Sequence, residues 1–200
     1  RAHPSRAARS RKRQVLLEVG GRSKATELKN RHLSPPVFCQ GYRSPLLVRM
    51  KIVVVGGAGY IGSICVELLL DEGHEVIVFD NLTEGHGLAV DERAAFIGGD
   101  LVRREEITRA LTETKPDAVM HFAANALVGE AMENPSKYFR NNVSSGINLL
   151  DAMRDAGVGR LVFSSTCATF GPPERVPIDE TLPQRPINPY GESKLIFERI

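Results

Sequence analysis

The sequence predicts an α/β fold with a doubly wound parallel sheet, and three observations lead to that prediction. From residue 51 onward, short apolar runs alternate with amphipathic stretches of helical length. The apolar runs are almost continuous in Val, Ile and Phe, as expected for strands that helices cover on both faces. A glycine-rich turn joins the first run directly to the first helical stretch. Alternating strands and helices form a parallel sheet with right-handed crossovers.

The expected elements follow in order along the chain. Strands are predicted at 51–55, 75–79, 94–97, 118–122 and 160–164, and helices at 61–72, 104–114, 136–156 and 190–200. Gly73 and Gly157 mark two helix ends, because glycine readily takes the left-handed conformation that follows a last helical turn. Five strands are present, whereas a six-stranded doubly wound sheet needs one more. We therefore expect residues 50–200 to be one domain, truncated before its last strand and its substrate domain.

Residues 1–49 differ from the rest in charge and pattern. They hold twelve Lys and Arg against two acids, Glu18 and Glu27, and they lack sustained periodicity. Such a segment buries too little apolar surface to offset its ordering entropy, so we predict a basic, disordered leader. Three origins are open: upstream sequence ahead of a start at Met50, an organellar transit peptide, or an arm for nucleic acid. Because the remaining residues are net acidic, the overall charge does not indicate nucleic-acid binding.

Three cysteines, an odd and widely spaced set, fit a reducing cytoplasm better than a disulfide framework. The apolar runs are of strand length and none approaches the roughly 18 residues of a membrane span. The histidines show no spacing typical of metal ligands, so we expect no metal.

The glycine-rich turn has the spacing of a dinucleotide site. Gly56, Gly59 and Gly62 follow the first strand, and a helix is expected to begin near Tyr60 and Ile61. Glycines in this context allow a tight turn, a close approach of backbone to a pyrophosphate and close packing of helix on strand. The helix N-terminus presents free N–H groups to the phosphates. The pattern is typical of a Rossmann-like domain.

Acidic residues follow the next two strands. Asp80 and Asn81 end the second strand, 18 residues beyond Gly62, where a carboxylate can accept both ribose hydroxyls and repel a 2′-phosphate. This placement favours NAD over NADP. Asp100 and Leu101 follow the third strand, where Asp100 is suitably placed for an adenine amino group; a Gly-Asp turn without a ligand is the alternative.

Groups suited to proton transfer follow the fifth strand. Ser164 and Thr166 lie at its carboxyl end, where open α/β sheets bind ligands. Tyr190 and Lys194 are four residues apart, so a helix places them on one face. A nearby cation favours phenolate and lowers the tyrosine pKa from about 10, as a general base for an alcohol hydroxyl requires.

The body of the chain resembles the extended short-chain dehydrogenases/reductases, and within them the UDP-glucose (UDP-galactose) 4-epimerase group. The resemblance covers residues 50–200 and does not extend to the leader. It is carried by residues 51–62, 79–86, 121–124, 128–130, 163–169, Gly171 and 186–194.

The resemblance implies a tightly held NAD that is reduced and reoxidised within each turnover. Tyr190 would remove the sugar 4-hydroxyl proton, Thr166 would hydrogen-bond the 4-oxygen, and Lys194 would bind the nicotinamide ribose and keep the tyrosine pKa low. It further implies a UDP-sugar substrate and a cytoplasmic homodimer. The catalytic assignment is thus Tyr190, Lys194 and Thr166. The cofactor assignment is Gly56, Gly59, Tyr60, Ile61, Gly62, Asp80, Asn81, Asp100, Leu101, Phe122, Ala123, Ala124, Asn142, Ser164, Tyr190 and Lys194.

Other functions remain open at this stage. A 4-epimerase for UDP-xylose/UDP-arabinose or a UDP-uronic acid fits the same residues. A nucleotide-sugar 4,6-dehydratase has Asp-Glu after the catalytic threonine, whereas Cys167 and Ala168 follow Thr166 here. A non-catalytic NAD-binding module would not need Thr166, Tyr190 and Lys194 together. For Asn142, capping of its own helix is the alternative to cofactor contact.

Overall fold

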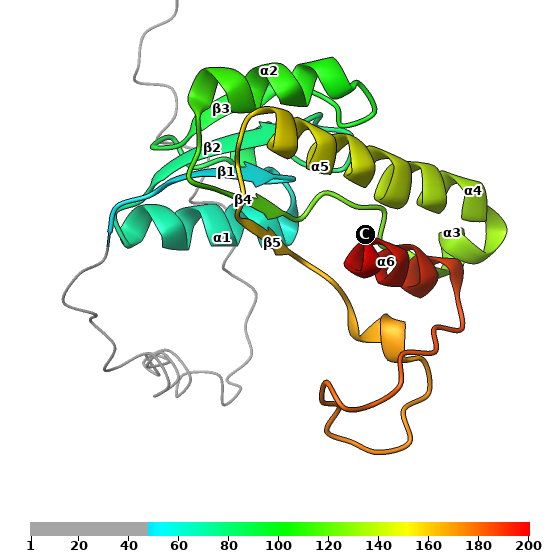
Figure 1. Ribbon diagram of the computed structural model, residues 1–200. Helices are drawn as coiled ribbons and strands as arrows, with labels where there is room; N and C mark the ends of the chain where they lie inside the picture. The colour runs from blue at the N-terminus through cyan, green and yellow to red at the C-terminus, as the bar shows by residue number, and fades with distance from the viewer. Residues whose placement is uncertain (1–47) are drawn as a thin grey trace, which may run out of the picture. The chain divides into compact units, whose positions relative to one another are not determined.

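The computed structural model describes residues 48–200, which form one compact unit (Figure 1). The expectations for the basic leader concern residues that lie almost wholly outside this described part. None of the described helices is long and apolar enough to cross a membrane.

The centre of the unit is a sheet of five parallel strands, which confirms the predicted fold class. The strands are β1 (Lys51–Val55), β2 (Glu75–Asp80), β3 (Ala95–Gly98), β4 (Ala118–His121) and β5 (Leu161–Phe163). Their order is β3-β2-β1-β4-β5. Val53 pairs with Ile77 of β2 on one side and with Val119 of β4 on the other. Strand order reverses between β1 and β4, and in open α/β sheets ligands bind at the carboxyl edge beside such a reversal.

Helices cover the two faces of the sheet (Figure 1). On one face, Val66 of α1 (Tyr60–Asp71) packs against Val54 and Val78. On the other, Leu111 of α2 (Arg104–Thr114) and Leu149 of α5 (Ser145–Asp155) belong to the core cluster that contains Val53, Ile77 and Val119. Successive strand residues point to opposite faces, so a continuous apolar run supplies both cores.

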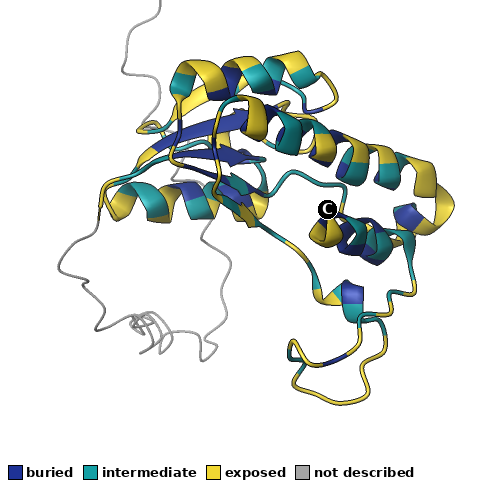
Figure 2. Ribbon diagram, in the orientation of Figure 1, coloured by how far each residue is buried: buried dark blue, intermediate teal, exposed yellow. Residues whose placement is uncertain are grey.

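The edge strands are less covered than the continuous apolar pattern predicts (Figure 2). Phe96 of β3 is 43% exposed and Val162 of β5 is 55% exposed, whereas the β1 valines are buried. Each edge strand has one neighbour, and within residues 48–200 the helices pack mainly over the three central strands.

The predicted helix at 136–156 is wrong in one respect, because it is not a single regular helix. It consists of α4 (Pro135–Tyr138), a π-helical segment η4 (Phe139–Ser144) and α5. The wider π-helical turn accommodates Asn142. Its buried side-chain amide donates hydrogen bonds to Asn125 and Ser193, which lie outside this helix. The short helix α3 (Val128–Glu133) was not predicted, since one and a half turns carry too little periodicity.

Two short 3-10 segments, η3 (Gly87–Ala89) and η5 (Cys167–Phe170), lie in the connections, and α6 (Pro189–Arg199) is the last described helix. The predicted glycine stops are confirmed, because Gly73 follows α1 at φ +88° and Gly157 follows α5 at φ +72°.

The core cluster beneath α2 gives a test of the packing. Leu111 is fully buried and Leu88 fully exposed, at 0% and 103%. We expect Leu111→Ala to lower the free energy of unfolding by about 2–5 kcal/mol, because a cavity remains where the side chain was. The matched change Leu88→Ala should stay within about 0.5 kcal/mol of the wild type. Chemical denaturation followed by circular dichroism measures both, and equal losses would contradict the described packing.

Candidate active site

The glycine turn between β1 and α1 is packed so closely that side chains are excluded from it. Gly56 has φ +81°, and a Cβ there would lie 2.4 Å from the Ala123 nitrogen. A Cβ at Gly62 would lie 2.1 Å from the Gly56 carbonyl oxygen. At Gly59 the nearest atom would be that same oxygen at 3.4 Å, so this position faces more open space. Gly59 is the N-cap of α1, supplies no side-chain cap, and no acid follows in the first turn.

Asp80 at the end of β2 fixes the turn from the side. Its Oδ2 accepts a hydrogen bond from the Ala58 N–H at 3.0 Å, and its Oδ1 accepts one from the Leu82 N–H at 2.8 Å. The residue is 8% exposed. Each carboxylate oxygen retains a further acceptor site, so the group can still receive a ligand hydroxyl.

Two adjoining cavities of about 50 and 140 Å³ lie at the carboxyl edge of the strands. They share four lining residues, Asp80, Asn81, Ala123 and Asn141. Of the residues assigned to the cofactor, the following line one or both: Gly56, Gly59, Asp80, Asn81, Asp100, Leu101, Phe122, Ala123 and Ala124. The sheet topology thus collects residues from four separate segments into one crevice.

The first cavity lies beside the turn that follows β3. Asp100 Oδ1 accepts from the Val102 N–H at 2.9 Å, and its Oδ2 accepts from the Asn81 side-chain amide at 3.2 Å. The Glu106 carboxylate of α2 accepts from the Asp100 N–H. These bonds stabilise the turn and orient Asp100, whose predicted contact with adenine stays a prediction.

Several assigned cofactor residues lie elsewhere. Tyr60 and Ile61 are 84% and 59% exposed at the start of α1, outside the cavity lining. Gly62 is buried behind the turn. Ser164 contributes its backbone carbonyl to Lys194.

Asn142 connects two other parts of the site. Its amide nitrogen donates to the Asn125 carbonyl and to the Ser193 hydroxyl, each at 3.0 Å, and its oxygen accepts from the Asn125 N–H at 2.9 Å. The residue is 4% exposed. Asn142 thereby links the segment after β4 to α6. This structural role was not predicted from the sequence.

Lys194 is the buried cation of the site. It is 3% exposed, its Nζ donates to the Ser164 carbonyl at 2.8 Å, and it lies 4.6 Å from the centre of the Phe163 ring. Burial lowers the pKa of Lys194 to about 8, and the nearby Glu198 carboxylate opposes part of that shift. The ammonium is therefore mostly protonated at pH 7.

His121 is the other buried titratable group near Lys194. Its ring lies 5.6 Å from the Phe163 ring and 5.5 Å from the Phe197 ring. Burial, together with repulsion from Lys194, lowers its pKa to about 3. His121 is neutral at physiological pH and adds no charge beside the lysine.

Tyr190 and Thr166 lie on two segments that pack against each other, α6 and η5. Tyr190 lies in the first turn of α6, which Asn188 caps by accepting from the Gly191 N–H at 2.8 Å. Thr166 begins η5 and its hydroxyl oxygen accepts from the Ala168 N–H. A Cβ at Gly191 would lie 2.5 Å from the Ala168 carbonyl oxygen, so α6 rests directly on the turn that Thr166 begins.

Two features of the site were not identified from the sequence. Asn141 lines both cavities, and the Asn-Asn pair before Val143 is the signal that could have indicated it. Tyr138 is fully buried with its ring against Tyr190, at a centroid separation of 6.4 Å.

Residues 52–200 match the NAD dependent epimerase/dehydratase family. The chain belongs to that family. The UDP-glucose 4-epimerase of Lactobacillus helveticus is 52% identical over 151 residues, which are 76% of this chain and 46% of that protein.

Solved structures agree with this membership of the epimerase/dehydratase family. The crystal structure of UDP-glucose 4-epimerase from Brucella ovis in complex with NAD superposes with a TM-score of 0.73 at 47% identity, over 74% of this chain and 46% of that one. The enzyme from Stenotrophomonas maltophila, with bound NAD and formylated UDP-arabinopyranose, gives 0.72 at 39% identity, over 76% and 47%. The chain spans about half the length of the curated relatives it matches.

The buried lysine predicts a pH-dependent stability. A folded-state pKa near 8, below the ordinary 10.5, means that between these values the unfolded chain binds more protons. The penalty for burying the charge is complete below pH 8 and is relieved as the pH rises towards 10.5. We expect the unfolding free energy of the wild type, relative to Lys194→Met, to rise by about 2 kcal/mol from pH 7 to pH 10.

The measurement is urea denaturation at both pH values. Lys115→Met, which alters an exposed lysine, is the matched control and should follow the wild type. A Lys194→Met difference that is the same at pH 7 and pH 10 would show that the ammonium is not desolvated.

Proposed function

We propose that this chain carries the NAD-binding and proton-transfer part of a nucleotide-sugar 4-epimerase, with UDP-glucose and UDP-galactose as the substrate pair. The observation that carries the proposal is the buried ammonium of Lys194. It is held at the carboxyl end of β5 and lies one helical turn from Tyr190 along α6. The match of residues 52–200 to the epimerase/dehydratase family supports it, as does the 52% identity to a UDP-glucose 4-epimerase over 151 residues.

The residues present fit NAD. The turn leaves no room for Cβ atoms at Gly56 and Gly62, while Gly59 faces open space at an uncapped helix N-terminus. Such a terminus favours a pyrophosphate. Asp80 lines the cavity with acceptor capacity that suits ribose hydroxyls, and its negative charge disfavours the 2′-phosphate of NADP.

NAD would supply a reversible hydride acceptor for C4 of the sugar, so that the carbon could lose its hydride and regain it on the other face. Tyr190 accepts the proton of the 4-hydroxyl and later gives it back, so the sugar is oxidised and reduced with no net redox change. Lys194 supports this exchange electrostatically, because its buried positive charge one helical turn from Tyr190 stabilises negative charge that develops on the reacting oxygen. Its Nζ gives one hydrogen to Ser164 and has two left for a ribose hydroxyl.

Thr166 supplies the hydroxyl that orients the reacting oxygen. Its Oγ1 already accepts from the Ala168 N–H, which leaves the hydroxyl hydrogen free to be donated to the sugar 4-oxygen. This arrangement disfavours a 4,6-dehydratase, because Cys167 and Ala168 offer no carboxylic acid for the elimination of water.

A UDP-pentose 4-epimerase is the second candidate. The Stenotrophomonas maltophila structure, which contains formylated UDP-arabinopyranose, supports it by its similarity to this chain. The two candidates share Tyr190, Lys194 and Thr166 and differ only in the sugar, so a substrate comparison separates them.

We further propose a cytoplasmic homodimer. Cys65 and Cys167 are both free thiols, as expected in a reducing compartment. The helices α2 and α5 pack side by side and are tied by ion pairs from Arg104 to Asp151 and Asp155, which makes them a firm surface for a second copy. Light scattering that finds a monomer at micromolar concentration would contradict the dimer.

The glycine turn gives a test of NAD binding that needs no turnover. Gly62→Ala places a methyl group against the Gly56 carbonyl, so the turn must open and we expect NAD affinity to fall at least tenfold. Gly129→Ala is the matched control, since its Cβ would meet nothing within 4 Å. Isothermal titration calorimetry with NAD measures both, and equal affinities would argue against this turn as the NAD site.

The catalytic assignment is tested by Tyr190→Phe, which removes only the hydroxyl. We expect at least a hundredfold loss of epimerisation with NAD affinity unchanged, because the proton acceptor is gone while the cofactor crevice remains. The assay follows conversion of UDP-galactose and of UDP-arabinose, without added NAD.

Two proteins should be assayed: the chain itself, and a chimera that joins residues 48–200 to the part of the Lactobacillus helveticus relative that this chain does not match. Turnover that disappears in Tyr190→Phe supports the epimerase. A chimera that binds NAD but converts no UDP-sugar would favour a non-catalytic binding module instead.

A further inference from the structure

A buried tyrosine stands directly against the proposed base. Tyr138, at the end of α4, is fully buried, and its ring meets that of Tyr190 edge to face, with centroids 6.4 Å apart and planes at 79°. Edge-to-face contacts between aromatic rings add stability beyond the burial of their surface and favour one mutual orientation. The ring of Tyr138 therefore forms a wall that fixes how Tyr190 can lie.

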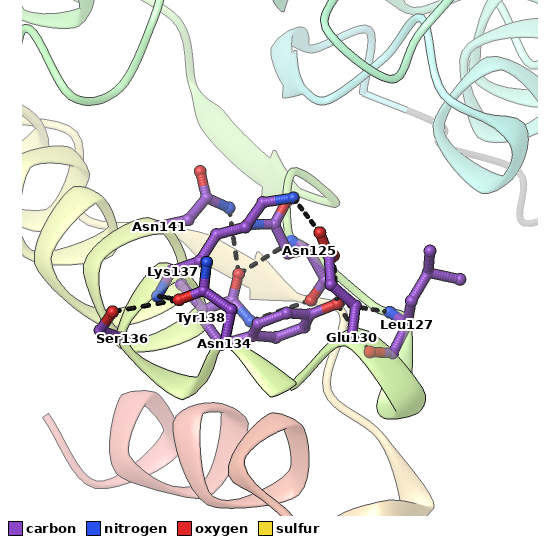
Figure 3. Close-up of polar contacts among 9 residues, drawn as sticks. Asn125, Leu127, Glu130, Asn134, Ser136, Lys137, Tyr138 and Asn141 are labelled. Atoms are coloured by element: carbon purple, nitrogen blue, oxygen red, sulfur yellow. Dashed lines mark hydrogen bonds and ion pairs between the residues drawn. The ribbon is translucent and has the colours of Figure 1, made fainter. Parts of the chain in front are cut away.

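The hydroxyl of Tyr138 is held by three contacts around α3 (Figure 3). It lies 2.7 Å from the Leu127 carbonyl oxygen and 2.9 Å from Glu130 Oε2, both acceptors, and it accepts from the Leu127 N–H at 3.0 Å. A phenol has one hydrogen, so the two acceptors share it, and the donor from Leu127 completes the set. These contacts fix the tip of the ring, and the buried position fixes its body.

The carboxylate of Glu130 is itself held in place. Lys137 Nζ pairs with Glu130 Oε1 at 2.5 Å, while Oε2 faces Tyr138. This lysine contact lowers the pKa of Glu130, so it is an ionised acceptor at neutral pH. Burial, followed by the Glu130 carboxylate, raises the pKa of Tyr138 to about 12. Tyr138 thus keeps its hydrogen and remains a donor throughout the physiological range.

We propose that Tyr138, locked by Leu127 and Glu130, is a positioning residue that sets the orientation of the Tyr190 ring for proton transfer. This inference rests on the proposed role of Tyr190 as the base. Tyr138 stays protonated and is held through its hydroxyl, whereas Tyr190 is held through the contact of its ring with that of Tyr138. The same contacts tie the start of α3 to α6, since Leu127 is the N-cap of α3.

The contact can be measured without turnover by NMR of the protein labelled with ¹³C in the tyrosine rings. The chain has four tyrosines, so Tyr190→Phe assigns the Tyr190 signals directly. Tyr138→Leu removes the ring and should shift the Tyr190 ring signals and speed up its ring flips at least tenfold. Tyr138→Phe keeps the ring but loses the hydroxyl contacts, and should speed up the flips with a smaller shift.

Two controls separate positioning from general destabilisation. Leu149→Ala removes a fully buried side chain from the core cluster over the sheet and should lower Tm without changing the Tyr190 signals. Lys115→Met removes the charge of an exposed lysine at the end of α2 and should also leave the Tyr190 signals unchanged.

The kinetic arm uses the chain or chimera that shows epimerisation. Misplacing a reacting group by about 1 Å can cost about a hundredfold in rate, so we expect Tyr138→Leu to lower kcat about ten- to a hundredfold with KM within twofold of wild type. Tyr138→Phe should recover part of that loss. A loss confined to KM, or no difference between the two variants, would overturn the proposal.

The NMR experiment tests the positioning role of Tyr138 independently of whether the protein is an epimerase. Tyr190 signals that are unchanged in folded Tyr138→Leu would overturn the positioning role even if the protein is an active epimerase. If Tyr138→Leu does not fold, Tyr138→Phe is used instead. A rate of Tyr190 ring flips in Tyr138→Phe that equals the wild-type rate would also overturn the positioning role. Altered Tyr190 signals in a protein that converts no UDP-sugar would support the contact and refute only the epimerase.

Discussion

The site depends on the missing side chains at Gly56 and Gly62. Because Gly56 has no Cβ, the turn after β1 can lie against the backbone of Ala123, which follows β4. Because Gly62 has no Cβ, the start of α1 can pack against the Gly56 carbonyl oxygen. The same turn gives the Ala58 N–H to Asp80 and accepts the His86 N–H at the Ala58 carbonyl. One tight turn thereby contacts the segments that follow β2 and β4 and holds the carboxyl ends of the three strands close together. The crevice between them exists because these three ends can approach so closely.

The helix that carries Tyr190 is fixed to this frame by buried polar contacts. Lys194 reaches the backbone after β5, Ser193 bonds Asn142 of the π-helical segment, and Gly191 rests on the turn after Thr166. Each buried polar group that lost its partner would cost about 1–3 kcal/mol, so α6 has few alternative positions. The position of Tyr190 is thus set by contacts that its neighbours on α6 make with the rest of the fold.

The sequence was sufficient for the fold, because the fold follows from local patterns. A buried strand, a glycine turn and a strand-end aspartate are adjacent in the chain, and parallel topology then brings them together. The π-helical turn at Asn142 and the contact of Tyr138 with Tyr190 were not predicted. The partners of Asn142 lie 17 and 51 positions away along the chain, and Tyr138 and Tyr190 are also far apart, so no periodic pattern records their proximity. Asn142 satisfies the helical pattern equally well, and only the buried amide partners from Asn125 and Ser193 explain the wider turn.

The groups in direct contact with the Lys194 ammonium are uncharged, so the side chain keeps its positive charge although it is buried. Its head group meets a carbonyl oxygen and the face of Phe163, and His121 beside it stays neutral. A carboxylate in direct contact would neutralise the ammonium. A carbonyl instead leaves a net positive charge in a buried region, where the nearby Glu198 carboxylate compensates only part of it. The lowered pKa of Lys194 is the stability cost of that arrangement, and it stays small enough for the lysine to remain charged at pH 7.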